Sequence, residues 1–195
     1  MKKMVLVLAL SALAALPVLA ALKVGDMAPV FSARASLAGK EFNFSLAKSL
    51  KKGPVVVYFY PSAYTNGCDL EAHTFAEMKD KFDAAGATII GVSADSLMRL
   101  DQFSADPSYC AGKFPVASDA DRKIATSYDL SAAAAKPGQK DVRGVEIDHD
   151  FIERETFVIG KDGKIIATLS SKEDHLTPDE HVKKSLEIVE KLKSE

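Results

Sequence analysis

The chain has 195 residues, of which 47% are apolar and 27% charged, and its formal net charge is −2. This is an ordinary balance for one globular domain with a substantial core, and the small net charge gives no indication of a nucleic-acid-binding protein. Its two cysteines are too few for a disulfide scaffold or for a zinc site closed by cysteines.

Residues 1–20 differ from the rest of the chain. Lys2 and Lys3 precede an unbroken apolar stretch, and Val18 and Ala20 fit the −3 and −1 positions of a signal-peptidase site. The pattern predicts a secretory signal peptide over 1–20, cut after Ala20 or Ala21, and a single mature domain over 21–195. An uncleaved membrane anchor is the alternative, although the stretch is marginal in length for a membrane span.

The lysine-rich start and the alanine-rich stretch after it are typical of bacterial signal peptides. We therefore expect a periplasmic protein that is free of the membrane after cleavage. The periplasm is kept oxidising, so a pair of cysteines there can form and keep a disulfide.

The first part of the mature chain predicts strands separated by helices. Residues 28–50 favour a strand, a Gly-Lys turn, a second strand and a short helix. The continuous apolar and β-branched run at 53–61 is typical of a strand buried on both faces, and 87–95 is predicted to be a second buried strand. Helices are predicted over 68–86, with Gly86 as its stop, and over 96–105, before Pro107. The buried side of the first of these helices is expected to carry Leu70, Phe75, Met78 and Phe82.

The second part predicts a strand over 114–119, a helix over 120–130 and a long surface loop over 131–151. A hairpin is expected over 154–170, turning at an Asp-Gly pair. The last element is an amphipathic helix over 177–194, with Thr177 as its N-cap and Pro178 in its first position. Its inward-facing residues are predicted to be Leu186, Val189 and Leu192.

This order of elements predicts an α/β fold, a mixed central sheet with helices on both faces. Reactive loops in such sheets usually follow the carboxyl end of a strand, and the segment "PSAYTNGC" over 61–68 occupies that place. Cys68 follows it in the first turn of a helix, where Thr65 or Asn66 is available as the cap. Unpaired N–H groups and the helix dipole there favour a thiolate, although a structural cysteine is the open alternative.

Three segments carry a resemblance to a known family: "APVF" near the mature start, "VVVYFYPSAYTNGCDLE" around Cys68, and "RETFVIGKDGKI" near the end. Pro61, Thr65 and Cys68 meet a Pro-x-x-x-Thr-x-x-Cys pattern, and Arg154 opens the last segment. Together these features resemble the peroxiredoxin family, most closely its Q-type subgroup, also called bacterioferritin comigratory protein, which has a glutamate at the position of Glu71. The resemblance covers nearly all of the mature chain and implies a thioredoxin-like fold and thiol-dependent reduction of peroxides.

The chemistry that peroxide reduction needs agrees with these residues. Cys68 is predicted to attack the O–O bond as a thiolate, and Arg154 to contact both thiolate and peroxide, lowering the pKa of Cys68 together with the helix start. Thr65 is predicted to hydrogen-bond sulfur or peroxide, and Pro61 to shield the site from water. Each residue also has a plain alternative: Pro61 ends the strand, Thr65 caps the helix, and Arg154 is a surface charge beside Glu153 and Glu155.

Many Q-type members carry a resolving cysteine five residues after the first, where this chain has His73. The second thiol here is Cys110, between the second helix and the 114–119 strand. We predict that Cys110 resolves oxidised Cys68 in an intramolecular disulfide, because an exposed unpaired thiol would be a hazard in an oxidising compartment. The alternative is a spare cysteine in a one-cysteine enzyme. In the reduced protein we expect Cys110 on the flank beyond the second helix, out of bonding range of Cys68.

The histidines are predicted to be solvated surface residues rather than metal ligands: His73, His149, His175 and His181. The resemblance implies a hydroperoxide substrate, a thioredoxin-like or other dithiol reductant, no bound cofactor, no metal and a monomer.

Two other classes remain as alternatives. A thioredoxin-like disulfide oxidoreductase would need Cys-x-x-Cys, where "CDLE" places Glu71, and a non-enzymatic binding module or metal chaperone would need a second nearby cysteine.

Overall fold

Apolar strands β3 (Val55–Phe59) and β4 (Thr88–Ser93) lie side by side and parallel at the centre of the sheet in the computed structural model, which describes residues 21–194. β5 (Val116–Ser118) extends the parallel part beyond β4. The sheet has seven strands in the order β2-β1-β5-β4-β3-β8-β9. The predicted signal peptide lies outside the described residues.

Antiparallel hairpins form both edges of this sheet. β1 (Ser32–Leu37) pairs with β2 (Lys40–Ser45) on one side, and β8 (Glu155–Ile159) pairs with β9 (Ile165–Ser170) on the other. The tight turn of the second hairpin depends on Gly163, whose φ of 85° lies in the region that favours glycine. The hairpin predicted over 154–170 is therefore confirmed, and β8 pairs directly with β3.

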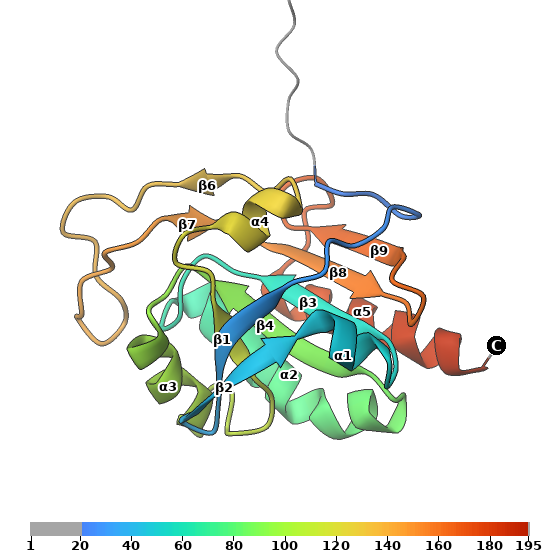
Figure 1. Ribbon diagram of the computed structural model, residues 1–195. Helices are drawn as coiled ribbons and strands as arrows, with labels where there is room; N and C mark the ends of the chain where they lie inside the picture. Colours follow the sequence, from blue (N-terminus) through green and yellow to red (C-terminus); the bar gives the residue numbers. More distant parts are fainter. Residues whose placement is uncertain (1–20, 195) are drawn as a thin grey trace, which may run out of the picture.

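Helices cover both faces of the sheet (Figure 1). The side chains of β3 alternate between two cores: Val56 and Tyr58 face one, and Val55, Val57 and Phe59 face the other. The first core is closed by α2 (Asn66–Ala84), α3 (Leu97–Ala105) and α5 (Pro178–Ser194). The second is closed by α1 (Leu46–Leu50) and α4 (Lys123–Ser127). The predicted α/β architecture, a mixed sheet with helices on both faces, is confirmed.

Three details differ from the sequence predictions. The helix expected over 120–130 is shorter, because the Asp119 carboxylate accepts hydrogen bonds from Ile124 N and Ala125 N and so sets where α4 begins. The loop expected over 131–151 contributes a short pair of strands, β6 (Ala132–Ala133) and β7 (Phe151–Ile152). Leu70 is 46% exposed, because it lies on the side of α2 opposite the buried stripe that runs through Phe75 and Phe82.

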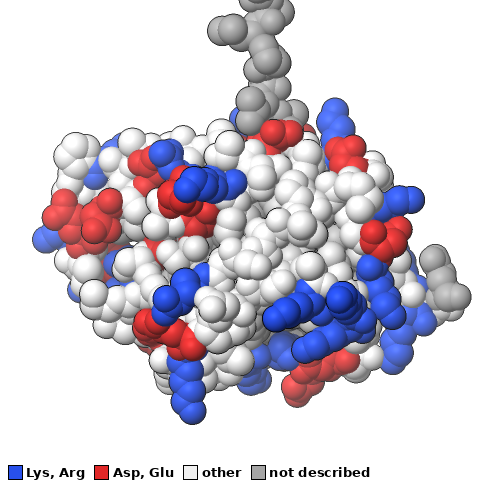
Figure 2. Space-filling model, viewed as in Figure 1, with Lys and Arg blue, Asp and Glu red and all other residues white. Residues whose placement is uncertain are grey.

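The surface carries charges of both signs. Lys and Arg side chains lie among Asp and Glu side chains over the face in Figure 2, with an uncharged area between them. Among the described residues, no helix is long and apolar enough to cross a membrane.

Candidate active site

The end of β3 and the start of α2 together position Cys68. The chain leaves β3 at Phe59, turns through residues 60–65 and enters α2 at Asn66, which makes Cys68 the third helical residue. The thiol group is almost completely buried, since the residue is 2% exposed. Thr65 occupies the N-cap position, but its hydroxyl donates to the Ser62 carbonyl at 2.8 Å and does not cap the helix.

Arg154 approaches Cys68 from the start of β8, the strand that pairs with β3 on the side away from β4. It lies just before β8, and its Nη2 donates to the Cys68 Sγ at 3.1 Å. Its Nη1 forms an ion pair with the fully buried Glu71, one turn further along α2. Gly67 makes room for this approach, because a Cβ there would lie 3.3 Å from both Arg154 Nη2 and Pro178 Cγ. The predicted pairing of Arg154 with Cys68 is thus present in the geometry, and Glu71 anchors it.

Burial and charge act on Cys68 in opposite directions. Burial raises the pKa of the Cys68 thiol, while Arg154, Thr65 and the Ser62 backbone lower it, and burial is the larger effect. The sequence predicts that the helix start and Arg154 lower the pKa of Cys68 below its ordinary value. The net shift is upward, so this prediction is wrong, although Arg154 itself acts in the predicted direction. Burial also raises the pKa of Glu71, to about 7, against the lowering effect of Arg154.

Pro61 and Thr65 lie in the turn that leads to the thiol. Pro61 is half-buried between Tyr60, the first residue after β3, and the buried Ser62. The Thr65 side chain is also half-buried and favours ionisation of Cys68. Both residues lie where the sequence pattern expects them, and their roles toward a peroxide stay predictions.

Cys110 lies in the interior, not on an exposed flank. It follows α3 in a turn, is 0% exposed and belongs to the same apolar cluster as Cys68, and both thiols are free. The expectation of an exposed thiol is therefore wrong, because the aromatic side chains around the turn enclose it. His73 on α2 contacts this segment, with its Nδ1 3.1 Å from the Ser108 carbonyl oxygen. Burial, followed by Asp106 and Asp69, raises the pKa of Cys110 well above the ordinary value.

All four histidines were predicted to be solvated, and for two of them, His149 and His181, this prediction is wrong. His181 is fully buried on α5, where its ring nitrogens lie 3.0 Å from Thr156 Oγ1 and 2.9 Å from Ser171 Oγ. His149 lies 2.8 Å from Asp95 Oδ1 and 3.3 Å from Ser62 Oγ. His73 and His175 are exposed, as predicted. Helical spacing offered a signal for His181, since it lies eight residues before the inward-facing Val189.

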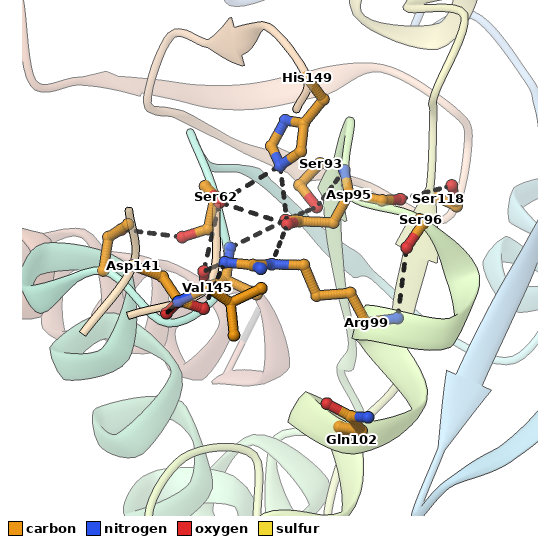
Figure 3. Close-up of polar contacts among 12 residues, drawn as sticks. Ser62, Ser93, Asp95, Ser96, Arg99, Gln102, Ser118, Asp141, Val145 and His149 are labelled. Atoms are coloured by element: carbon orange, nitrogen blue, oxygen red, sulfur yellow. Dashed lines mark hydrogen bonds and ion pairs between the residues drawn. The ribbon is translucent and has the colours of Figure 1, made fainter. Parts of the chain in front are cut away.

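A buried polar group that the sequence analysis missed supports the turn before Cys68. The Asp95 carboxylate accepts a hydrogen bond from Ala63 N at 2.8 Å, and Arg99 Nη2 donates to Ala63 O at 2.9 Å. In Figure 3, Asp95 lies between Ser62, His149 and Arg99. No group of three or more His, Cys, Asp or Glu side chains within residues 21–194 could hold a metal ion.

A thiol held at a helix start by a guanidinium, on a thioredoxin-like fold, defines a cysteine-dependent oxidoreductase. The family model described as the AhpC/TSA family matches residues 24–168. The chain therefore belongs to the AhpC/TSA family, and it is a peroxiredoxin, an enzyme of the class that reduces peroxides with a cysteine thiol.

Individual relatives agree with this assignment. The peroxiredoxin Bcp of Xanthomonas campestris is 36% identical over 112 residues. The match covers 57% of this chain and 63% of that relative, which is less than two thirds of its length. Among solved structures, peroxidoxin BcpB from Mycobacterium tuberculosis has a TM-score of 0.72 at 26% identity, covering 88% of this chain and 98% of that one. The structure of the Xanthomonas campestris bacterioferritin comigratory protein, described for its alkyl peroxide reduction activity, has a TM-score of 0.63 at 27% identity, covering 82% and 91%.

Proposed function

We propose that this protein reduces hydrogen peroxide and organic hydroperoxides with Cys68 as the peroxidatic residue. The observation that carries the proposal is the 3.1 Å hydrogen bond from Arg154 Nη2 to Cys68 Sγ, with the other arm of the guanidinium paired to Glu71. A guanidinium fixed in this way stabilises the thiolate and can contact the peroxide oxygen that becomes negatively charged. The alkyl peroxide reduction described for the Xanthomonas relative supports the inclusion of organic hydroperoxides.

The first chemical step is nucleophilic attack by the Cys68 thiolate. The sulfur attacks one peroxide oxygen, the O–O bond breaks, and the leaving oxygen takes a proton and departs as water or an alcohol. Cys68 is oxidised to a sulfenic acid as the peroxide is reduced. We expect the Thr65 hydroxyl, which donates to the Ser62 carbonyl in this structure, to turn toward the sulfur or the peroxide during the reaction. Pro61, which has no N–H, is expected to limit the access of water to the turn.

Resolution follows through the second thiol. The Cys110 thiol attacks the Cys68 sulfenic acid, a disulfide forms and water leaves. The contact between His73 and Ser108 supports this role, because it keeps the Cys110 segment alongside the helix that carries Cys68. A thioredoxin-like or other dithiol then reduces the disulfide by thiol exchange. We further propose that the enzyme acts as a monomer in the periplasm, after removal of residues 1–20.

The test is peroxide consumption by purified protein with and without a dithiol reductant. Cys68→Ser should abolish turnover and leave the melting temperature close to that of the wild type, because the hydroxyl is a far weaker nucleophile of similar size. Cys110→Ser serves as the matched control and should still consume about one peroxide per chain in a single turnover. Retained turnover in Cys68→Ser would contradict the assignment.

A further inference from the structure

The turn Ser62–Tyr64, which leads into the Cys68 helix, is held by buried charged groups from outside that helix. Asp95, after β4, accepts from Ala63 N, and Arg99 on α3 donates to Ala63 O. Arg99 Nε also lies 2.8 Å from Asp95 Oδ1, so the two side chains form an ion pair beside Ser62 (Figure 3). Removing one partner of such a buried pair leaves the other charge uncompensated, which is strongly destabilising.

The loop over 134–150, between β6 and β7, adds contacts both to Arg99 and to the turn. Asp141 Oδ2 lies 2.8 Å from Arg99 Nη2 and also accepts from Arg143 Nη2 at 2.9 Å. Burial raises the pKa of Asp141, but hydrogen bonds from Val145 and Arg143 and the charge of Arg99 outweigh it, so this carboxyl stays ionised. Val142 N donates to Tyr64 O at 3.0 Å. The Arg143 guanidinium stacks on the Tyr64 ring, with Cζ 3.3 Å from the ring centroid.

Tyr64 is the residue on which these contacts converge. It is 2% exposed and has a φ of 60°, a left-handed conformation that is costly for a bulky side chain and persists only where surrounding contacts hold it. The edge of its ring contacts Phe103 and Tyr109 at centroid distances of 5.1 Å and 5.3 Å. Tyr109 immediately precedes Cys110. Through its ring, Tyr64 therefore connects the turn that leads to Cys68 with the segment that carries the second thiol.

We propose that Asp95, Arg99, Asp141 and Arg143, called here the clamp, hold the turn in its closed form, and that release of Tyr64 from the clamp sets how fast oxidised Cys68 is resolved. The proposal rests on the function proposed above. A disulfide needs Cα atoms within roughly 6.8 Å and sulfurs in contact, and both thiols are buried and free in the closed form. We expect the turn to open before the bond forms, because in the closed form the Cys68 sulfur is held by its hydrogen bond from Arg154 Nη2.

The clamp then decides between two fates of the Cys68 sulfenic acid. Opening lets the Cys110 thiol attack it, with loss of water. While the turn stays closed, a second peroxide can oxidise the sulfenic acid to a sulfinic acid and depart as water or an alcohol. The clamp residues are positioning residues, because their contacts end on residues 62–64, whereas the hydrogen bond to Cys68 Sγ comes from Arg154.

The test uses Arg143→Met in the full mature protein. Arg143 is 30% exposed at its side chain, so the fold should survive a substitution that removes both the ion pair and the stack on Tyr64. The matched control is Arg122→Met, which removes an arginine paired with Asp150 near the end of the same loop. Hydrogen exchange of the reduced protein, followed by mass spectrometry of peptides covering 62–70, should be about tenfold faster in Arg143→Met and unchanged in the control.

The functional measurement is the ratio of disulfide to sulfinic acid after a pulse of excess peroxide. Arg143→Met should form less sulfinic acid than the wild type by about tenfold, with its first reaction with peroxide unchanged. Unchanged exchange would overturn the clamp. Faster exchange with an unaltered product ratio would overturn its control of resolution, and a slower first step would make Arg143 part of the reactive site instead. If the wild type forms no sulfenic acid, the proposed function fails, while hydrogen exchange still decides whether the clamp holds the turn.

Discussion

Arg154 contacts two acidic groups, the Cys68 thiol and the Glu71 carboxyl, and its charge is shared between them. The Glu71 carboxyl has a pKa of about 7, and its negative charge raises the pKa of Cys68. The two groups therefore titrate as a coupled pair around one guanidinium. Near neutral pH, protonation of Glu71 leaves more of the Arg154 charge available to the thiolate.

We predict that Glu71→Gln lowers the pKa of Cys68, because the amide can still accept a hydrogen bond from Arg154 but carries no charge. The rate of thiol alkylation against pH should rise at lower pH in the variant than in the wild type. Glu77→Gln is the control, since Glu77 is exposed on the same helix and pairs with His73. An unshifted alkylation profile would mean that Glu71 only orients Arg154.

Single residues were predictable from the sequence where a motif names them. Cys68 and Arg154 were found because the pattern ties their residue types to an order along the chain. The role of Asp95 could not be predicted, because its contacts with Arg99 and with Ala63 N exist only in the folded chain. The polar residues around Cys110 predict a surface position, because the burial of its thiol in the first core arises only from tertiary packing.

Among the elements, the strands and long helices were predictable because burial imposes a period on their sequences. β3 is a continuous apolar run, β4 is centred on apolar residues, and α5 repeats apolar residues at helical spacing. The segment over 131–151 has no such period, because its order comes from charged side chains: Asp141 pairs with Arg99 on α3 and with Arg143 in the same segment. The sequence predicts a longer helix than α4, because its start is set by a side-chain contact: the Asp119 carboxylate accepts from Ala125 N.

The docking of α5 on the sheet contains a buried histidine with consequences for stability. Burial, followed by the charge of Arg154, lowers the pKa of His181 to about 4. Because the folded state holds the ring neutral while the unfolded chain binds a proton near pH 6.5, this group stabilises the fold fully above about pH 6.5. That contribution is lost as the pH falls toward 4.

We predict that His181→Gln makes the free energy of unfolding less sensitive to acid. The wild type should lose about 3 kcal/mol more than the variant between pH 7 and pH 4, as judged by urea denaturation at each pH. Glutamine keeps groups that can hydrogen-bond Thr156 and Ser171. The exposed His175, in the loop before α5, supplies the comparison His175→Gln, whose pH dependence should match the wild type. Equal acid sensitivity in His181→Gln and wild type would refute the argument.

At the scale of the whole molecule, the first residues after the predicted signal peptide belong to the folded domain. Leu22 O accepts from Thr168 Oγ1 at 2.7 Å, and Ala21 and Leu22 pack against the second core. We predict that N-terminal sequencing of protein from a periplasmic fraction starts near Ala21 or Leu22. A chain begun at Ala21 should melt at the same temperature as the exported protein, because it retains these contacts. Recovery of intact Met1 from the membrane fraction would favour the anchor instead.

The burial of both thiols also bears on whether Cys110 reacts with Cys68 of the same chain or of another chain. Cys68 and Cys110 are both buried in the first core of one chain, so a bond between two chains would need both molecules to open at once. A local opening within one chain exposes far less surface and is therefore easier. We predict that peptide mapping of protein treated with one equivalent of peroxide finds a Cys68–Cys110 cross-link, and that the oxidised protein elutes as a monomer in size exclusion. Cys110→Ser should show no cross-link and should turn over more slowly with a dithiol reductant. A disulfide-linked dimer on a non-reducing gel, or wild-type turnover in Cys110→Ser, would assign the resolving thiol to another molecule.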